Sequence, residues 1–251
     1  MVSEPDAQQD DPLVIRDVKI KTICCWDTVG SLGIPLGIPK IEDLVDRIRG
    51  YNYRFHDTGL SSKVENAFHA LALDEERTHF QPTLWKKTEE TKKANLKQCW
   101  FPGVHSNIGG GFDDQEIADM TLAWMMQQLL PFLEFDESYL DSIIQNCDVH
   151  SEGQWAAGKI YDKNWRQWLF NWGGTRKPGV DDNTEETIHK SVRVRMKLKP
   201  EWSNKALRGW TWNEDGYWTN GLKRIAEDEL GSLEEKLAGK AVVKDQLKKY
   251  L

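Results

Sequence analysis

Residues 18–30, VKIKTICCWDTVG, decide the fold class. They begin with alternating apolar and polar residues and end in a continuous apolar run, as a strand does when it enters a sheet covered on both faces. The strand is predicted to end at Asp27, because residues 27–39 contain three glycines and two prolines and therefore form a shaped loop. Asp27 thus lies at the carboxyl end of a predicted strand.

The segments that follow repeat the order of strand, loop and helix. Ser62 and Glu65 have the spacing of a capping box, and the apolar residues after them share one helical face, which predicts a helix. Such alternation is typical of an α/β fold with a parallel sheet and covering helices. The predicted elements are a helix over 41–49, a strand over 51–55, a helix over 62–74, a strand over 96–101, a glycine-rich loop over 102–111 (PGVHSNIGGG) and a helix from 113 to 130.

The chain beyond residue 135 is rich in tryptophan and less regular, and most of the 12 tryptophans are expected to be buried or to line a groove. Residues 191–199 alternate apolar and basic side chains, which predicts a strand with four positive charges on one face. Ser232 and Glu235 form a second capping-box pattern, and the helix they begin is expected to dock on the body. These patterns predict a disordered leader (1–13), an α/β domain (14–221) and a C-terminal helical segment (222–251).

Composition excludes several classes of protein. The 251 residues include 33 Lys+Arg and 40 Asp+Glu, a formal net charge of −7, so nucleic acid is not expected as a partner. The basic side chains of 193–199 are more typical of a solvated strand face than of a nucleic-acid site. No apolar run approaches the ~20 residues of a spanning helix and no signal peptide begins the chain, which predicts a cytoplasmic protein without a transmembrane segment. The four cysteines form no C-x-x-C pair, and we expect them to be reduced.

Asp27 and His105 are the candidate catalytic pair. Each lies in a glycine-rich loop directly after a predicted strand, and the carboxyl ends of parallel strands meet at one edge of the sheet. A carboxylate beside an imidazole fixes its tautomer and stabilises the imidazolium that forms when it accepts a proton. Two alternatives remain open: Asp27 merely caps a turn, or Asp27 and His105 bind a metal together with Asp113 and Asp114.

Several longer segments resemble the catalytic domain of the type VI secretion phospholipase effector-like family, an α/β-hydrolase-like domain of bacteria and fungi. The segments are CWDTVGSLGIP (25–35), VENAFHALALDEERTHFQPTLW (64–85), WFPGVHSNIGGGF (100–112) and TLAWMM (121–126), and ETIHKSVRVR (186–195) and ALRGW (206–210) resemble the fungal members. The resemblance implies a Ser-Asp-His triad with Asp27 as the acid and His105 as the base, a lipid or ester substrate and no cofactor or metal. It also implies that Thr28, Ser106, Asn107, Gly109 and Gly110 contact substrate.

The nucleophile of that triad is missing from the sequence. It belongs on a G-x-S-x-G elbow before the acid and the base, and no serine of this chain has glycine at both −2 and +2, with Ser31, Ser106 and Ser232 coming nearest. Asn107 also stands where bacterial members usually carry Asp. Ser106 adjoins His105, so the two side chains diverge, and Cys25 has apolar neighbours, which makes a buried structural thiol the simpler interpretation.

We therefore expect the acid and base portion of a serine esterase or phospholipase-like hydrolase, with little or no activity alone. It would be a truncated product or would act with a complementing chain that supplies the serine. The alternative is a non-catalytic binding or scaffold protein derived from the hydrolase fold. Without the first strands of such a fold the sheet would expose an edge, so self-association is also expected.

Overall fold

The fold was analysed in a computed structural model, which describes residues 17–30, 58–77, 80–136, 138–139, 141–142, 155–161 and 174–241. The predicted leader, the helix over 41–49 and the strand over 51–55 lie outside these residues. So do Ser31, Cys147 and the tryptophans at 165, 168 and 172.

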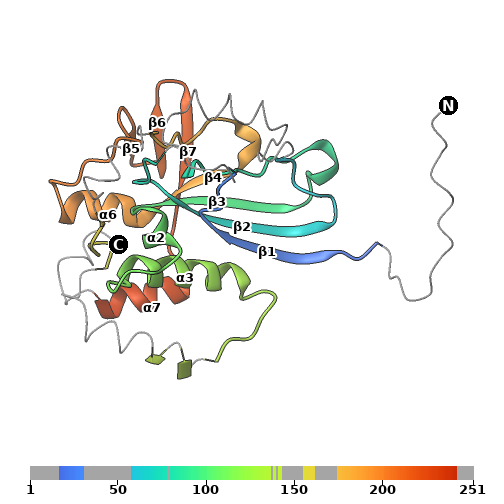
Figure 1. The fold of residues 1–251 in the computed structure, drawn as a ribbon, viewed down its shortest axis with the longest axis horizontal. Coiled ribbons are helices and arrows are strands. Elements are labelled where there is room, and N and C mark those ends of the chain that lie inside the picture. Colours follow the sequence, from blue (N-terminus) through green and yellow to red (C-terminus); the bar gives the residue numbers. More distant parts are fainter. Residues whose placement is uncertain are drawn as a thin grey trace, which may run out of the picture.

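One seven-stranded sheet forms the centre of the fold (Figure 1), with the order β1-β2-β3-β4-β7-β6-β5. The first five strands in this order are parallel, whereas β6 pairs antiparallel with both β7 and β5. The α/β fold with a largely parallel sheet is therefore confirmed. The strands are β1 (Ile20–Trp26), β2 (Val64–Ala72), β3 (Asn95–Phe101), β4 (Glu186–His189), β5 (Thr211–Asn213), β6 (Tyr217–Asn220) and β7 (Lys223–Asp228).

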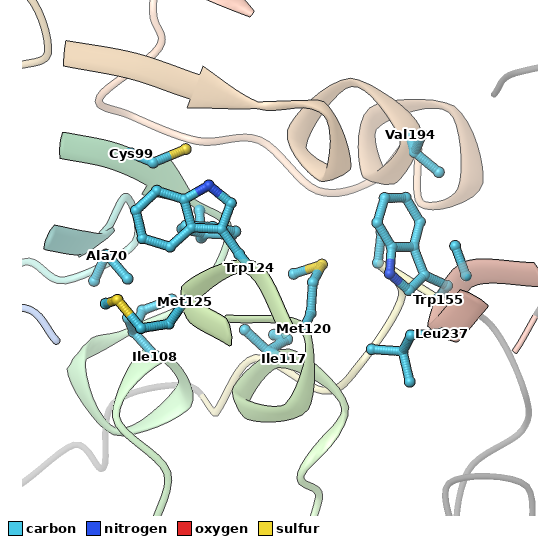
Figure 2. Close-up of a cluster of buried hydrophobic side chains, with 14 of the residues drawn as sticks. Ala70, Cys99, Ile108, Ile117, Met120, Trp124, Met125, Trp155, Val194 and Leu237 are labelled. Carbon is cyan, nitrogen blue, oxygen red and sulfur yellow. The ribbon is translucent and has the colours of Figure 1, made fainter. Parts of the chain in front are cut away.

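Helices α3 and α7 lie side by side and cover one face of the sheet (Figure 1). Trp124 of α3 and Trp155 are buried in this layer, and Figure 2 shows Trp155 with Val194 on one side and Leu237 on the other. The docking expected for the C-terminal helix is thus confirmed for α7. The helices are α2 (His105–Ile108), α3 (Glu116–Leu129), α6 (Lys190–Leu198) and α7 (Ser232–Ala241), with 3-10 turns at Glu89–Thr91 and Asp182–Thr184.

The helix predicted over residues 62–74 is wrong, because Val64–Ala72 forms strand β2. This strand lies between β1 and β3, which are hydrogen-bonded to it in parallel on its two sides, and nearly all of its residues are buried. A strand buried on both faces is a continuous apolar run, which matches a helical face by chance as easily as it matches alternation. Of the supposed capping residues, Ser62 lies in a turn in which the Val64 amide donates to the Ser61 carbonyl, and Glu65 lies in β2 itself.

The strand predicted over residues 191–199 is also wrong, because Lys190–Leu198 forms helix α6. The imidazole of His189 caps its first turn by accepting from the Ser191 amide. Two of the basic side chains leave the supposed solvated face: Arg193 binds Glu227, and Arg195 donates to the carbonyls of residues 156 and 158. The predicted row of four positive charges along a strand therefore does not form.

The C-terminal region is more regular than the sequence predicts. Strands β4 to β7 extend the central sheet, and Trp218 of β6 is buried against it. The segment from residue 222 is not helical throughout, because β7 occupies residues 223–228 and α7 begins only at Ser232. The predicted boundary at 221/222 falls in the turn between β6 and β7.

Candidate active site

The site lies where β1, β2 and β3 end, at the carboxyl edge of the parallel sheet. Asp27 follows β1 directly, with its amide donating to the Ala70 carbonyl of β2, and His105 begins the short helix α2 just after β3. Asp27 has a positive φ of 46°, which turns the chain sharply out of the strand. This is the edge at which open parallel sheets bind their ligands.

Asp27 and His105 are paired, as predicted. His105 Nδ1 lies 2.8 Å from Asp27 Oδ2, although 78 residues separate the two side chains. Asp27 Oδ1 accepts from the Ala72 amide at 2.9 Å, and Arg176 Nη2 donates to Oδ2 at 2.8 Å. The Asp27 side chain is completely buried, whereas that of His105 is 30% exposed. The imidazole is therefore the part of the pair that an outside molecule can reach.

Asp27 is held as a carboxylate. Burial raises the pKa of this carboxyl, but the hydrogen bond from His105, the charge of Arg176 and the Ala72 amide outweigh burial and leave the pKa below its ordinary value. An ionised carboxylate can only accept hydrogen bonds, so the proton of the neutral imidazole lies on Nδ1 and Nε2 is the free acceptor. That is the tautomer a general base needs.

Three side chains hold His105 in place from the loop after β2. The ring of Phe80 meets the imidazole edge-on at 5.0 Å between centroids, and the Arg77 guanidinium stacks on Phe80 at 3.5 Å. Glu75 accepts the His105 amide at 3.2 Å and pairs with both Nε and Nη2 of Arg77 at 2.9 Å. The pKa of Glu75 is lowered, because its bonds to Arg77 and to the His105 amide outweigh its burial.

Asp74 joins the loops after β2 and β3. Its carboxylate accepts from the Gly103 amide at 2.7 Å, from Trp202 Nε1 at 3.0 Å and from Asn204 Nδ2 at 2.8 Å. Burial nevertheless raises the pKa of Asp74 above its ordinary value, because these bonds offset burial only in part. Through Gly103 this contact fixes the start of α2 and hence the position of His105.

A second histidine lies beneath the pair. His69 Nε2 accepts from the Thr28 amide at 3.0 Å, which places the proton on Nδ1, 3.3 Å from Gln98 Oε1. Burial lowers the pKa of His69 to about 4. This imidazole therefore stays neutral and holds the chain just after Asp27.

The five residues expected to contact substrate have different surroundings. Thr28 and Gly109 are exposed, and Ser106 and Gly110 are half-buried, all within or next to the two site loops. Asn107 is buried and its amide serves the backbone: Nδ2 donates to the Lys159 carbonyl and Oδ1 accepts from the Val104 amide. The structure thus gives Asn107 the role of a brace for α2.

A second serine and histidine contact lies in the core, which the sequence did not predict. Ser191 Oγ lies 2.7 Å from His189 Nδ1, and His189 Nε2 lies 2.8 Å from Glu234, but all three side chains are buried. This Ser-His-Glu chain links α6 to α7 inside the core, away from any substrate. Within the described ranges no group of three or more His, Cys, Asp or Glu side chains could hold a metal ion, so Asp27, His105, Asp113 and Asp114 do not form one ligand cluster.

Arg176 is the site residue that sequence reasoning missed. It lies 149 residues from Asp27, in the polar segment with which the described residues resume at 174, and its side chain is fully buried. The Gly174 amide, donating to the Glu76 carbonyl at 2.6 Å, brings this segment to the loop after β2. No local motif marks such a residue; the only available signal was an arginine in a segment with few apolar residues.

The fold and the site define the class: an α/β protein with an acid and imidazole pair at the carboxyl edge of its parallel strands. Residues 4–128, just under half of the chain, match the family described as T6SS, Phospholipase effector Tle1-like, catalytic domain. The match confirms the resemblance for the motifs up to residue 126 and covers β1, β2, β3, Asp27 and His105, whereas the motifs at 186–195 and 206–210 lie outside it. No curated protein matches the chain, and no solved structure does. None of the described helices combines the length and apolar character needed to cross a membrane.

Proposed function

We propose that this protein supplies the acid and the base of a serine-dependent hydrolase that cleaves carboxylic esters of lipids. The observation that carries the proposal is the 2.8 Å contact between His105 Nδ1 and the buried Asp27 carboxylate, at the carboxyl edge of a domain from a phospholipase effector family. A lipid ester is the substrate that the family description supports.

In this mechanism His105 Nε2 removes the proton from a serine hydroxyl as the serine oxygen attacks the ester carbonyl. Asp27 keeps the ring oriented and stabilises the imidazolium. His105 then gives the proton to the departing alcohol, which leaves an acyl-serine. Water, deprotonated by His105, attacks this acyl group, and the proton returns to the serine oxygen as the fatty acid departs.

None of the serines in residues 1–251 has the G-x-S-x-G pattern of a nucleophile elbow. We infer that the serine comes from a segment outside residues 1–251, in the same polypeptide or in a complementing chain. The protein alone is then inactive. The substrate contacts proposed for Thr28, Ser106, Gly109 and Gly110 rest on their places in the two site loops.

A fluorophosphonate probe, which reacts only with an activated serine, tests the proposal. Residues 1–251 would be expressed alone and in frame with the coding sequence upstream, and both forms would be treated with the probe. We expect labelling of the longer form only, and its loss in the His105→Ala variant of that form. Labelling of residues 1–251 alone would overturn the proposal and point to Ser31 or Ser106, whereas labelling of neither would favour a binding or scaffold protein.

A further inference from the structure

Arg176 is a buried cation with one polar partner among the residues that the structure describes. Its Nη2 donates to Asp27 Oδ2 at 2.8 Å, and the same oxygen accepts from His105 Nδ1 at 2.8 Å. Both ends of this ion pair are completely buried. Its Nε and Nη1 are also buried and have no hydrogen-bond partner within the described part of the chain. The guanidinium is therefore directed at the acid of the site and makes no other ion pair with the described residues.

This arrangement is a poor way to stabilise a fold. Removing a guanidinium from water is costly, and unpaired donors add to that cost, so a well-packed apolar side chain of similar volume often gives an equally stable core. Structural arginines elsewhere in this protein are better satisfied: Arg195 donates to two backbone carbonyls, and Arg193 binds both oxygens of Glu227. What Arg176 does that an apolar residue would not is act on Asp27.

The geometry points to Arg176 as a positioning residue of the acid and base pair. It keeps Asp27 ionised and holds Oδ2 where the His105 Nδ1 proton is donated. Its positive charge also balances the carboxylate, so that the imidazole gives up its proton after each transfer instead of remaining trapped as an ion pair. This role rests on the proposed function, because it matters only if His105 exchanges protons.

The other charged groups around the pair leave this role to Arg176. On the β2 side His69 is buried and neutral, so it brings no charge to Asp27. In the loop after β2, Glu75 accepts the backbone amide of His105 and is balanced by Arg77, which reaches the imidazole only through Phe80. Arg176 is the one described cation in contact with Asp27 other than His105 itself when protonated.

Titration of the His105 imidazole by nuclear magnetic resonance tests the inference on residues 1–251 without any serine. The His105 signal is assigned by its loss in His105→Gln. We expect Arg176→Met to raise the pH midpoint of this titration, because the variant removes a positive charge that is bound to the same carboxylate oxygen as the imidazole. Arg176→Lys, which keeps the charge, is expected to restore most of the wild-type midpoint.

Lys177→Met is the matched control, because it removes the same charge from the next residue, which is exposed. An unchanged midpoint in folded Arg176→Met, or an equal shift in Lys177→Met, would overturn the inference. If Arg176→Met does not fold, the double variant Arg176→Met with Asp27→Asn decides between the two roles. If Arg176 serves to balance the charge of Asp27, the double variant is expected to fold. Failure of both variants to fold would show a structural role and overturn the inference.

This experiment separates the two proposals. A shifted midpoint with no fluorophosphonate labelling of the longer form would retain Arg176 as the partner of the pair and reject the serine hydrolase. Labelling that persists alongside an unshifted midpoint would retain the hydrolase and reject the role of Arg176.

Discussion

At the scale of single residues, Asp27 and His105 are each held by several contacts. Asp27 uses both carboxylate oxygens on three partners, and His105 is held by its ring, its amide and its stacking neighbour. The geometry that the proposed general base needs is therefore present without a bound molecule. Such preorganisation is what general-base catalysis requires.

His69 gives a pH dependence to stability. Because its pKa falls from 6.5 to about 4 on folding, the unfolded chain binds a proton between these values that the folded chain does not. This contribution to the free energy of unfolding is complete above pH 6.5, declines as the pH falls, and is lost by about pH 4, a change of about 3 kcal/mol.

Urea unfolding between pH 4 and pH 8 measures this change when wild type is compared with His69→Gln, which cannot titrate. We expect the difference in stability between the two proteins to shrink as the pH falls. Parallel curves would show that His69 is protonated in the folded state as easily as in the unfolded chain.

At the scale of elements, the sequence predicts the pairing of Asp27 with His105 better than it predicts some of the helices and strands around that pair. Strands β1 and β3 and helix α3 were predictable because each has a clear period and a clear end at a glycine-rich loop or a proline. Strand β2 and helix α6 were not predictable, because their secondary structure depends on tertiary contacts. Two flanking strands pair with β2, and partners distant in the sequence bind the basic residues of α6. Arg176 was out of reach because only the tertiary fold brings it to Asp27.

The start of α2 depends on a glycine. Gly103 has a φ of 126°, and a Cβ there would lie 2.8 Å from Cβ of Asn107. Gly111 has a similar φ of 118° but nothing within 4 Å of the same position, so it is the matched control. We expect Gly103→Ala to be destabilising by about 1–3 kcal/mol more than Gly111→Ala, because only the first adds a clash to the strained backbone.

Chemical unfolding measures this difference, and the His105 imidazole signal shows whether α2 has moved. Equal destabilisation by the two variants would mean that α2 shifts without cost.

Helix α7 is tied to the core by a buried hydrogen bond between His189 and Glu234 at 2.8 Å. Removing Glu234 leaves the imidazole without this partner, so we expect Glu234→Ala to lower the free energy of unfolding by about 2 kcal/mol. Glu235→Ala removes the same charge from the neighbouring exposed residue and is expected to change stability by less than about 0.5 kcal/mol.

Amide hydrogen exchange locates the effect of Glu234→Ala. If amide exchange is accelerated more in α7 than in α3, the loss of stability lies in the helix that the hydrogen bond between His189 and Glu234 anchors. Equal behaviour of the two glutamate variants would rule out the anchoring role.

At the scale of the whole molecule, the sheet has an edge at β1. Within the described residues β1 pairs only with β2, and Val18 and Ile20 are 60% and 43% exposed. Lys19 and Lys21 interrupt this apolar row, which limits but does not remove the tendency of an open edge to pair with another chain.

We expect concentration-dependent self-association through this edge. The double variant Val18→Lys and Ile20→Lys should weaken it by about tenfold or more, since a fully buried aliphatic side chain contributes roughly 1.5–3 kcal/mol. Leu222→Lys is the control, because Leu222 is fully exposed in the turn between β6 and β7. Sedimentation velocity over a range of concentrations measures the change, and a monomeric wild type would contradict the expectation.

The position of β4 beside β3 affects how this protein can be divided for experiments. A fragment ending at residue 128, where the family match ends, would contain Asp27 and His105 but would leave Gln98, Cys99 and Trp100 without the strand that pairs with them. It would also lose Glu186, which binds the Trp100 indole at 2.7 Å, and Arg176. The unit defined by sequence relatedness is therefore shorter than the unit that contains these contacts, and a clone that is to keep them, together with the docking of α7, needs to continue through α7.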